Sequence, residues 1–159
     1  MALAVVSALA VAQPWRADRE GDDALKLLEK GDFAGARAAA ERASDINPLS
    51  PEPYFERSAI EDSAGNLQLA ARSLEDAVRL EPASPEAWRR LGEYYAVNLD
   101  DPARAVPTLR AAVYLDPASP LNRSAYVVAL RARTAAEAER VAAERAKRAA
   151  KRARRAAQP

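Results

Sequence analysis

The sequence predicts an all-α protein: a right-handed α-solenoid of about three helix pairs, followed by a solvating helix and a long basic C-terminal helix. Two observations predict it. Hydrophobic residues make up 49% of the chain but aromatic residues only 6%, which favours close-packed helices over a sheet. The chain also repeats one junction at a spacing of 34 and then 35 residues: Asn47-Pro48-Leu49-Ser50-Pro51, Glu81-Pro82-Ala83-Ser84-Pro85 and Asp116-Pro117-Ala118-Ser119-Pro120.

Each junction is suited to end one helix and begin the next. Its first proline has no N–H and disfavours a continuing helix. Its serine accepts a hydrogen bond from a free N–H of the following helix, and its second proline falls at the first helical position, where no N–H is needed. The sequence therefore predicts one helix pair between residues 18 and 48, a second between 51 and 82, and a third between 85 and 117.

Apolar residues within these segments recur at helical spacing, and Gly31 and Gly65 mark turns between the paired helices. The third pair has one extra residue in the turn before Pro102, and Asp101 is a good cap there. Pro107 lies beyond the first turn of the helix that begins at Pro102, so we expect a kink but no break.

The third pair resembles the tetratricopeptide repeat. It fills the aromatic-x2-L-G-x2-Y, A-x3-L-x2-A and P positions with Trp88, Leu91, Gly92, Tyr95, Ala105, Leu109, Ala112 and Pro117. The second pair matches less fully, because Arg57 replaces the usual leucine and Glu61 the usual tyrosine. The first pair has Glu20 where an aromatic residue is usual. The resemblance implies a solenoid over residues 17–131 and says little about function.

Apolar residues after Pro120 predict a solvating helix over the last repeat. Thr134 and Glu137 fit a capping box, which predicts that a separate Ala/Arg/Lys-rich helix begins there and forms a tail of residues 132–159. The segment from residue 131 onward carries a charge of +7 and the first 130 residues carry −6. The basic side chains at its end are Arg145, Lys147, Arg148, Lys151, Arg152, Arg154 and Arg155.

The tail has two interpretations: a solvated alanine-rich helix, or a binder of anionic lipid or an anionic polymer by charge alone. It has no aromatic side chain to stack on bases, so nucleic acid is the less expected partner. Binding by charge alone would weaken steeply with added salt.

Residues 1–16 form an apolar N-terminal segment, Ala2 to Ala12 with one serine, followed by Gln13-Pro14-Trp15-Arg16. The apolar run is shorter than the about 20 residues that span a bilayer. Three interpretations remain: a signal-peptide core, the end of a membrane helix that begins upstream of Met1, or a buried N-terminal helix. Trp15 and Arg16 suit a membrane–water interface.

The chain has no cysteine and no histidine, which excludes thiol nucleophiles, imidazole bases and Cys/His metal sites. Its adjacent carboxylates, such as Asp22-Asp23 and Asp100-Asp101, point to different faces of a helix. No phosphate-binding loop is present. The sequence therefore predicts a protein that is not an enzyme and has no cofactor.

The resemblance implies that a protein or peptide binds the concave face, which the first helix of each pair lines. On that register the face offers Leu25, Phe55, Asp62, Arg89, Glu93 and Arg131. Phe55 and Arg89 are either binding anchors or residues that pack between repeats. Some family members clamp the terminal carboxylate of a heat-shock chaperone with a Lys/Asn/Arg set. This chain has Gly21, Leu25, Phe55 and Ala59 at clamp positions, so that partner is disfavoured.

A looser resemblance concerns location. Four stretches, at residues 13–19, 45–53, 59–61 and 114–120, are similar to the repeat region after the membrane domain of bacterial O-antigen ligase/polymerase-like proteins. That resemblance implies a non-catalytic scaffold at a membrane surface, on the extracytoplasmic side, that is part of or partner to such a glycan machinery. The alternative is a soluble, cytoplasmic adaptor.

Overall fold

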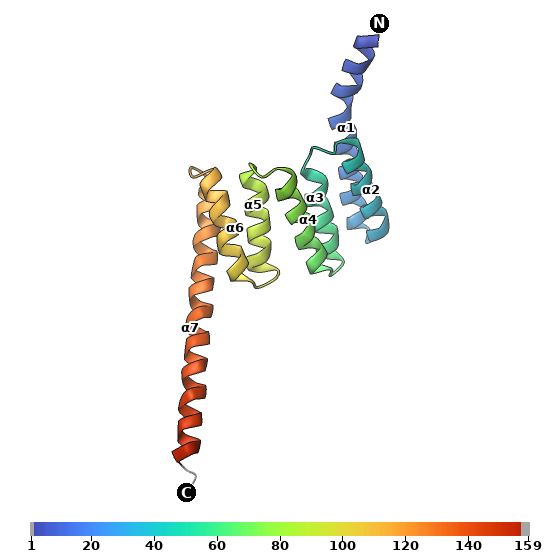
Figure 1. Ribbon diagram of the computed structural model, residues 1–159. Coiled ribbons are helices and arrows are strands. Elements are labelled where there is room, and N and C mark those ends of the chain that lie inside the picture. Colours follow the sequence, from blue (N-terminus) through green and yellow to red (C-terminus); the bar gives the residue numbers. More distant parts are fainter. Residues whose placement is uncertain (1, 157–159) are drawn as a thin grey trace.

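The computed structural model describes the backbone of residues 2–156 and the side chains of residues 16–153. The described chain folds into seven helices that stand in a row as an α-solenoid. The last helix begins within the row, beside the sixth helix, and its C-terminal part projects beyond it (Figure 1). The helices are α1 (Ala2–Glu29), α2 (Phe33–Ile46), α3 (Glu52–Ser63), α4 (Leu67–Leu80), α5 (Pro85–Val97), α6 (Pro102–Leu115) and α7 (Pro120–Ala156). This confirms the predicted fold class and all three helix pairs.

The predicted caps form at two of the three junctions. Ser84 Oγ accepts a hydrogen bond from the Ala87 amide, and Ser119 Oγ accepts one from the Asn122 amide, both at 3.3 Å. At the first junction the prediction is wrong by one residue. There Pro51 is the N-cap, α3 begins at Glu52, and Ser50 Oγ accepts from the Glu52 amide two residues on.

The turn between the two helices of each pair contains a residue in the left-handed backbone region. Gly31 and Gly65 have φ values of 76° and 77°, which a residue without Cβ adopts without strain. The longer third turn uses Asp100, with φ 47°. Asp101 then caps α6 by accepting from the Arg104 amide at 3.0 Å, as predicted. α6 runs through Pro107 without a break.

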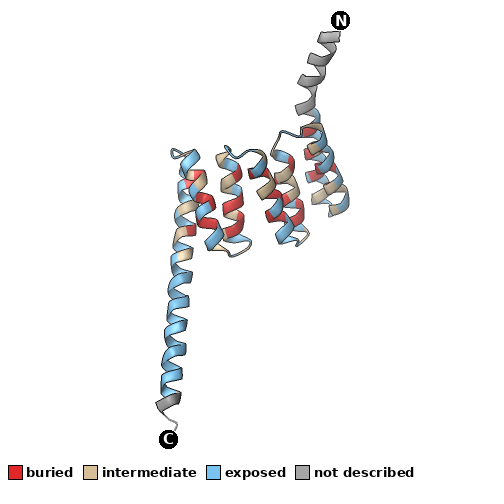
Figure 2. Cartoon of the chain, viewed as in Figure 1, coloured by how far each residue is buried: buried red, intermediate tan, exposed pale blue. Residues whose placement is uncertain are grey.

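The buried residues lie where the helices face one another (Figure 2). Most of the buried apolar residues are alanines. Small side chains let the helices approach closely. One close approach is between Gly92 on α5 and Leu109 on α6, where a Cβ at position 92 would lie 2.5 Å from Leu109 Cγ and 3.2 Å from its backbone nitrogen. Leu109 is 1% exposed. The third repeat therefore requires glycine at position 92.

The two unusual residues of the second repeat are explained by polar pairs. Glu61, which is buried, accepts two hydrogen bonds from Arg37 on α2, at 2.6 and 2.9 Å, and one from Asn66 at 2.8 Å. Arg57 donates to Ser73 Oγ and to Asp76 on α4, both at 3.0 Å. These bonds join neighbouring helices where the family pattern has apolar contacts.

Both ends differ from the prediction in the same way. α1 continues from the apolar segment into the array without the expected new start near Asp18, and α7 continues from Pro120 to Ala156. Thr134 does not cap a new helix, because its hydroxyl donates to the Arg131 carbonyl at 2.8 Å inside α7. Alanine-rich sequence without a glycine allows that helix to continue.

No helix in the described part of the chain is long and apolar enough to cross a membrane. The side chains of residues 1–15, on which the membrane interpretations depend, lie outside the described residues.

Candidate functional site

A groove of about 670 Å³ lies on the face formed by α3, α5 and α7, with Leu74 and Leu109 from α4 and α6 behind it. Its wall contains aliphatic side chains that remain open to solvent: Val97 is 78% exposed, and Leu121 and Val128 are each 63% exposed. An exposed apolar patch within a groove is typical of an interaction site. α7 supplies two of these three side chains, so the solvating helix also forms one side of the groove.

Two carboxylates stand among these apolar side chains. Asp62 Oδ1 accepts hydrogen bonds from the Tyr94 hydroxyl at 2.7 Å and from Asn98 Nδ2 at 3.1 Å. Burial, together with the bond to Asp62, raises the pKa of the Tyr94 hydroxyl far above its ordinary value, so this hydroxyl stays a donor. Glu93 Oε2 accepts from Arg89 at 2.7 Å. Asp62 is thus held in place from α5 and the turn that follows it.

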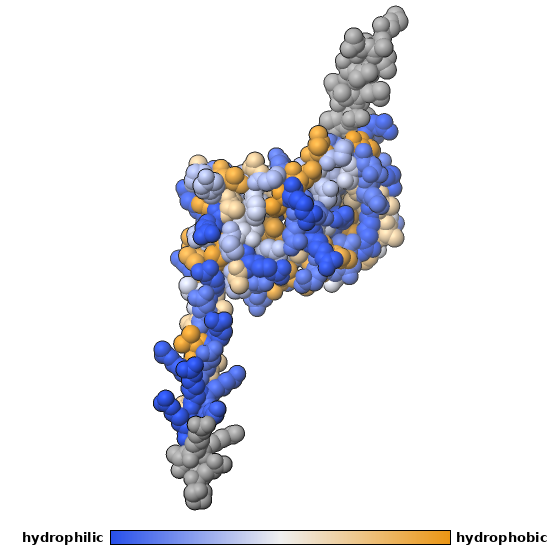
Figure 3. Space-filling model, in the orientation of Figure 1, coloured by the Kyte–Doolittle hydropathy of each residue, from blue (hydrophilic) through white to orange (hydrophobic). Residues whose placement is uncertain are grey.

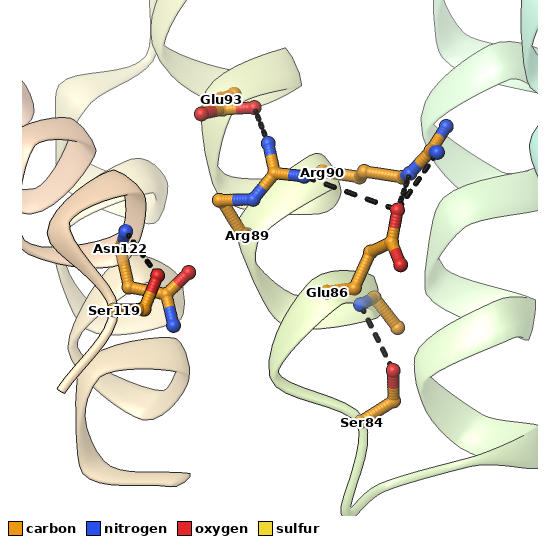
Figure 4. Close-up of polar contacts among 8 residues, drawn as sticks. Ser84, Glu86, Arg89, Arg90, Glu93, Ser119 and Asn122 are labelled. Atoms are coloured by element: carbon orange, nitrogen blue, oxygen red, sulfur yellow. Dashed lines mark hydrogen bonds and ion pairs between the residues drawn. The ribbon is translucent and has the colours of Figure 1, made fainter. Parts of the chain in front are cut away.

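The arginines near the groove are already paired (Figure 4). Arg90, the only basic residue in the groove lining that the structure describes, donates to Glu86 at 2.8 Å and lies 4.4 Å above the Phe55 ring. Arg89 lies between Glu93 and Glu86. The charge left open to a ligand in the groove is therefore negative.

The structure brings three of the six predicted groove residues together. Phe55, Asp62 and Glu93 line the groove, although Phe55 is only 7% exposed under Arg90. Leu25, which is 43% exposed on α1, lies outside the groove lining, as do the half-buried Arg89 and the exposed Arg131.

Several residues that line the groove were not predicted from the sequence. Arg90 was overlooked because its neighbour Arg89 occupies the family's groove position. Leu121 and Val128 were assigned only to the covering face of α7. Their spacing of seven residues on one helix face is the signal that could have identified them.

A second group of carboxyls lies where α1 meets α3. Gly21 on α1 leaves room for the Glu56 carboxyl, which a Cβ at position 21 would clash with. Glu56 Oε2 is buried and has no hydrogen-bond partner among the described residues. Burial raises the pKa of Glu56 to about 7, with further contributions from Glu52, Asp22 and Asp18.

We expect Glu56 to make the protein less stable as the pH rises. Its pKa is raised in the folded state, so its contribution is most favourable below its ordinary value of 4.5 and is lost between pH 4.5 and about 7. Because this half-buried group is partly hydrated, we expect the free energy of unfolding to fall by only about 1 to 2 kcal/mol over that range. Glu56→Gln should remove this pH dependence. Urea denaturation at pH 4.5, 6 and 8 measures this, and an unchanged pH slope in the variant would contradict it.

The described part of the C-terminal tail is a solvated helix (Figure 3). The side chains of Arg145, Lys147, Arg148, Lys151 and Arg152 are exposed, while those of Arg154 and Arg155 lie outside the described residues. No cluster of acidic side chains that could hold a metal ion occurs within the described range.

Comparison with known proteins supports the fold. A family profile described as "Tetratricopeptide repeat" matches residues 85–119. The Sgt2 TPR domain from Aspergillus fumigatus is similar at a TM-score of 0.62 and 21% identity, over 78% of this chain and 82% of that one. The first TPR domain of human RPAP3 is similar at a TM-score of 0.63 and 17% identity, over 78% of this chain and 97% of that one.

The first TPR of Spaghetti (RPAP3), bound to the HSP90 peptide SRMEEVD, is similar at a TM-score of 0.60 and 16% identity, over 76% of this chain and 94% of that one. A search among curated proteins finds none that matches the chain. The profile match and the shared helix arrangement lead to one conclusion. The chain folds as an α-solenoid of tetratricopeptide repeats, with its best-matched repeat at residues 85–119.

Proposed function

We propose that the protein is a non-catalytic interaction scaffold that binds a segment of another protein in the groove between α3, α5 and α7. The proposal rests on three solvent-exposed aliphatic side chains in the groove, Val97, Leu121 and Val128. They lie beside the Asp62 carboxylate, which the Tyr94 hydroxyl holds by a hydrogen bond. A domain of this fold in a similar structure holds a peptide, which supports the same use here.

Photocrosslinking tests this proposal. A photoreactive residue in place of Val128 should crosslink to a protein partner in cells, because this side chain is exposed within the groove. The matched control is the same residue at Leu49, which is 82% exposed in the junction before α3 and lies outside the groove lining. Equal crosslinking from both positions would contradict a groove site.

We also propose that residues 1–16 hold the scaffold at a membrane surface, on the extracytoplasmic side. The apolar run followed by Trp15 and Arg16 supports this, and the continuous helix α1 would join that segment directly to the array. Carbonate washing of membranes should leave the intact protein bound. Complete release of uncleaved protein would instead support the alternative, a soluble adaptor.

Two finer proposals rest on the sequence alone. Partnership with O-antigen ligase/polymerase-like machinery rests on the four similar stretches, and the crosslinked partner would identify or exclude it. Binding of anionic lipid or polymer by the exposed basic tail rests on its charge of +7 from residue 131 onward. Binding that is unchanged between low and high salt would rule out the second.

A further inference from the structure

The groove has exposed aliphatic side chains next to the carboxylate of Asp62, which can still accept hydrogen bonds. Asp62 Oδ1 is occupied by the Tyr94 hydroxyl and by Asn98, while Oδ2 has no hydrogen bond among the described residues. A carboxylate accepts about four hydrogen bonds. Asp62 is therefore fixed in orientation but still able to accept from a ligand.

Positive charge in the groove is not available to a ligand. Arg90 is the one basic lining residue within the described chain, and it is held by Glu86 and by the Phe55 ring. Arg89, next to the groove, is held by Glu93. Because Glu93 is neutralised by Arg89, an acidic ligand would meet Asp62 without a free cation, at a cost from like-charge repulsion.

Further carboxyls lie outside the groove, at the contact between α1 and α3, where Glu52, Asp22 and Asp18 act on Glu56. Glu56 is only partly ionised near neutral pH, because its pKa is raised to about 7. These groups do not define a site. Carboxylates near a groove attract a ligand with positive charge during approach as well as when it is bound.

We propose that this groove selects protein segments that carry large aliphatic side chains next to a lysine or arginine. The aliphatic side chains pack against Val97, Leu121 and Val128, and the cation donates to Asp62. The inference rests on the proposed function and names the chemistry of its partner. It is opposite in charge to the acidic peptide SRMEEVD that the similar Spaghetti domain binds.

Three synthetic peptides of equal length and identical leucine spacing provide the test, one with lysines, one with glutamates and one with serines at the intervening positions. Fluorescence anisotropy with the full chain should show the lysine peptide binding at least tenfold tighter than the serine peptide, and no binding of the glutamate peptide or of SRMEEVD. Asp62→Asn should weaken the lysine peptide about tenfold. Val128→Asp, at an exposed position, should weaken the serine peptide.

Asp45→Asn is the matched control, because Asp45 is exposed on α2, away from the groove, and the variant removes the same charge. It should change binding less than twofold. Equal losses from both variants, or equal binding of the lysine and glutamate peptides, would overturn the inference. If the serine peptide binds as tightly as the lysine peptide and Val128→Asp abolishes both, the inference fails while the proposed function stands. If no peptide binds and Val128 gives no crosslink, both fail.

Discussion

Replacing Leu109 with alanine is expected to lower the free energy of unfolding by about 3 kcal/mol, because large-to-small changes at buried leucines lose both burial and packing. Leu109 is 1% exposed and lies against Gly92, which has no side chain of its own. Urea denaturation followed by circular dichroism measures the loss. Leu49→Ala, at a position 82% exposed, is the matched control and should change stability by less than about 0.5 kcal/mol.

The pairing of Leu109 with Gly92 makes the prediction sharper. Gly92→Ala alone should cost about 1 to 3 kcal/mol, because its new Cβ would meet Leu109 Cγ at 2.5 Å and Cδ2 at 2.8 Å. In the double variant those two atoms are gone and only the backbone nitrogen at 3.2 Å remains. The double variant should therefore be more stable than the sum of the single losses predicts. Strict additivity would show that the two helices do not approach as described.

Replacing Arg37 with methionine is expected to lower the free energy of unfolding by about 2 to 3 kcal/mol. Among the described residues it leaves the buried Glu61 carboxylate with Asn66 as its one side-chain hydrogen-bond donor. The Glu61 side chain is 8% exposed and that of Arg37 is 39% exposed, so the loss should fall below that of a fully buried pair. Arg42→Met, which breaks the more exposed pair with Glu20, is the matched control and should cost less than about 1 kcal/mol.

A second variant and a pH series separate charge from packing. Arg37→Met combined with Glu61→Leu should recover most of the loss, because apolar side chains of similar size remove the buried charge. The hydrogen bonds from Arg37 hold the pKa of Glu61 below its ordinary value. That stabilisation is present above pH 4.5 and is lost as the pH falls, so the cost of Arg37→Met should shrink in acid. A cost independent of pH would point to packing alone.

Where most helices begin and end could be predicted from the sequence, because helix ends depend on local chemistry. Proline at positions 85 and 102, a capping Ser84 or Asp101, and Gly31 and Gly65 in the turns act on backbone bonds within a few residues. The same local rules failed at Thr134, where a capping pattern lies inside a helix that alanine allows to continue.

Half of the predicted groove residues lie outside the groove, because the side chains that face it depend on how neighbouring helices pack. Arg89 and Arg90 are adjacent in sequence, yet only Arg90 lines the groove. Asp62 meets Tyr94 and Asn98 across more than thirty residues of chain, and neither partner is marked by a motif. Helix termini and the pairing of Arg89 and Arg90 follow from contacts within a few residues of chain. The open carboxylate in the groove, that of Asp62, instead follows from the position of α5 relative to α3, which brings Tyr94 and Asn98 to it.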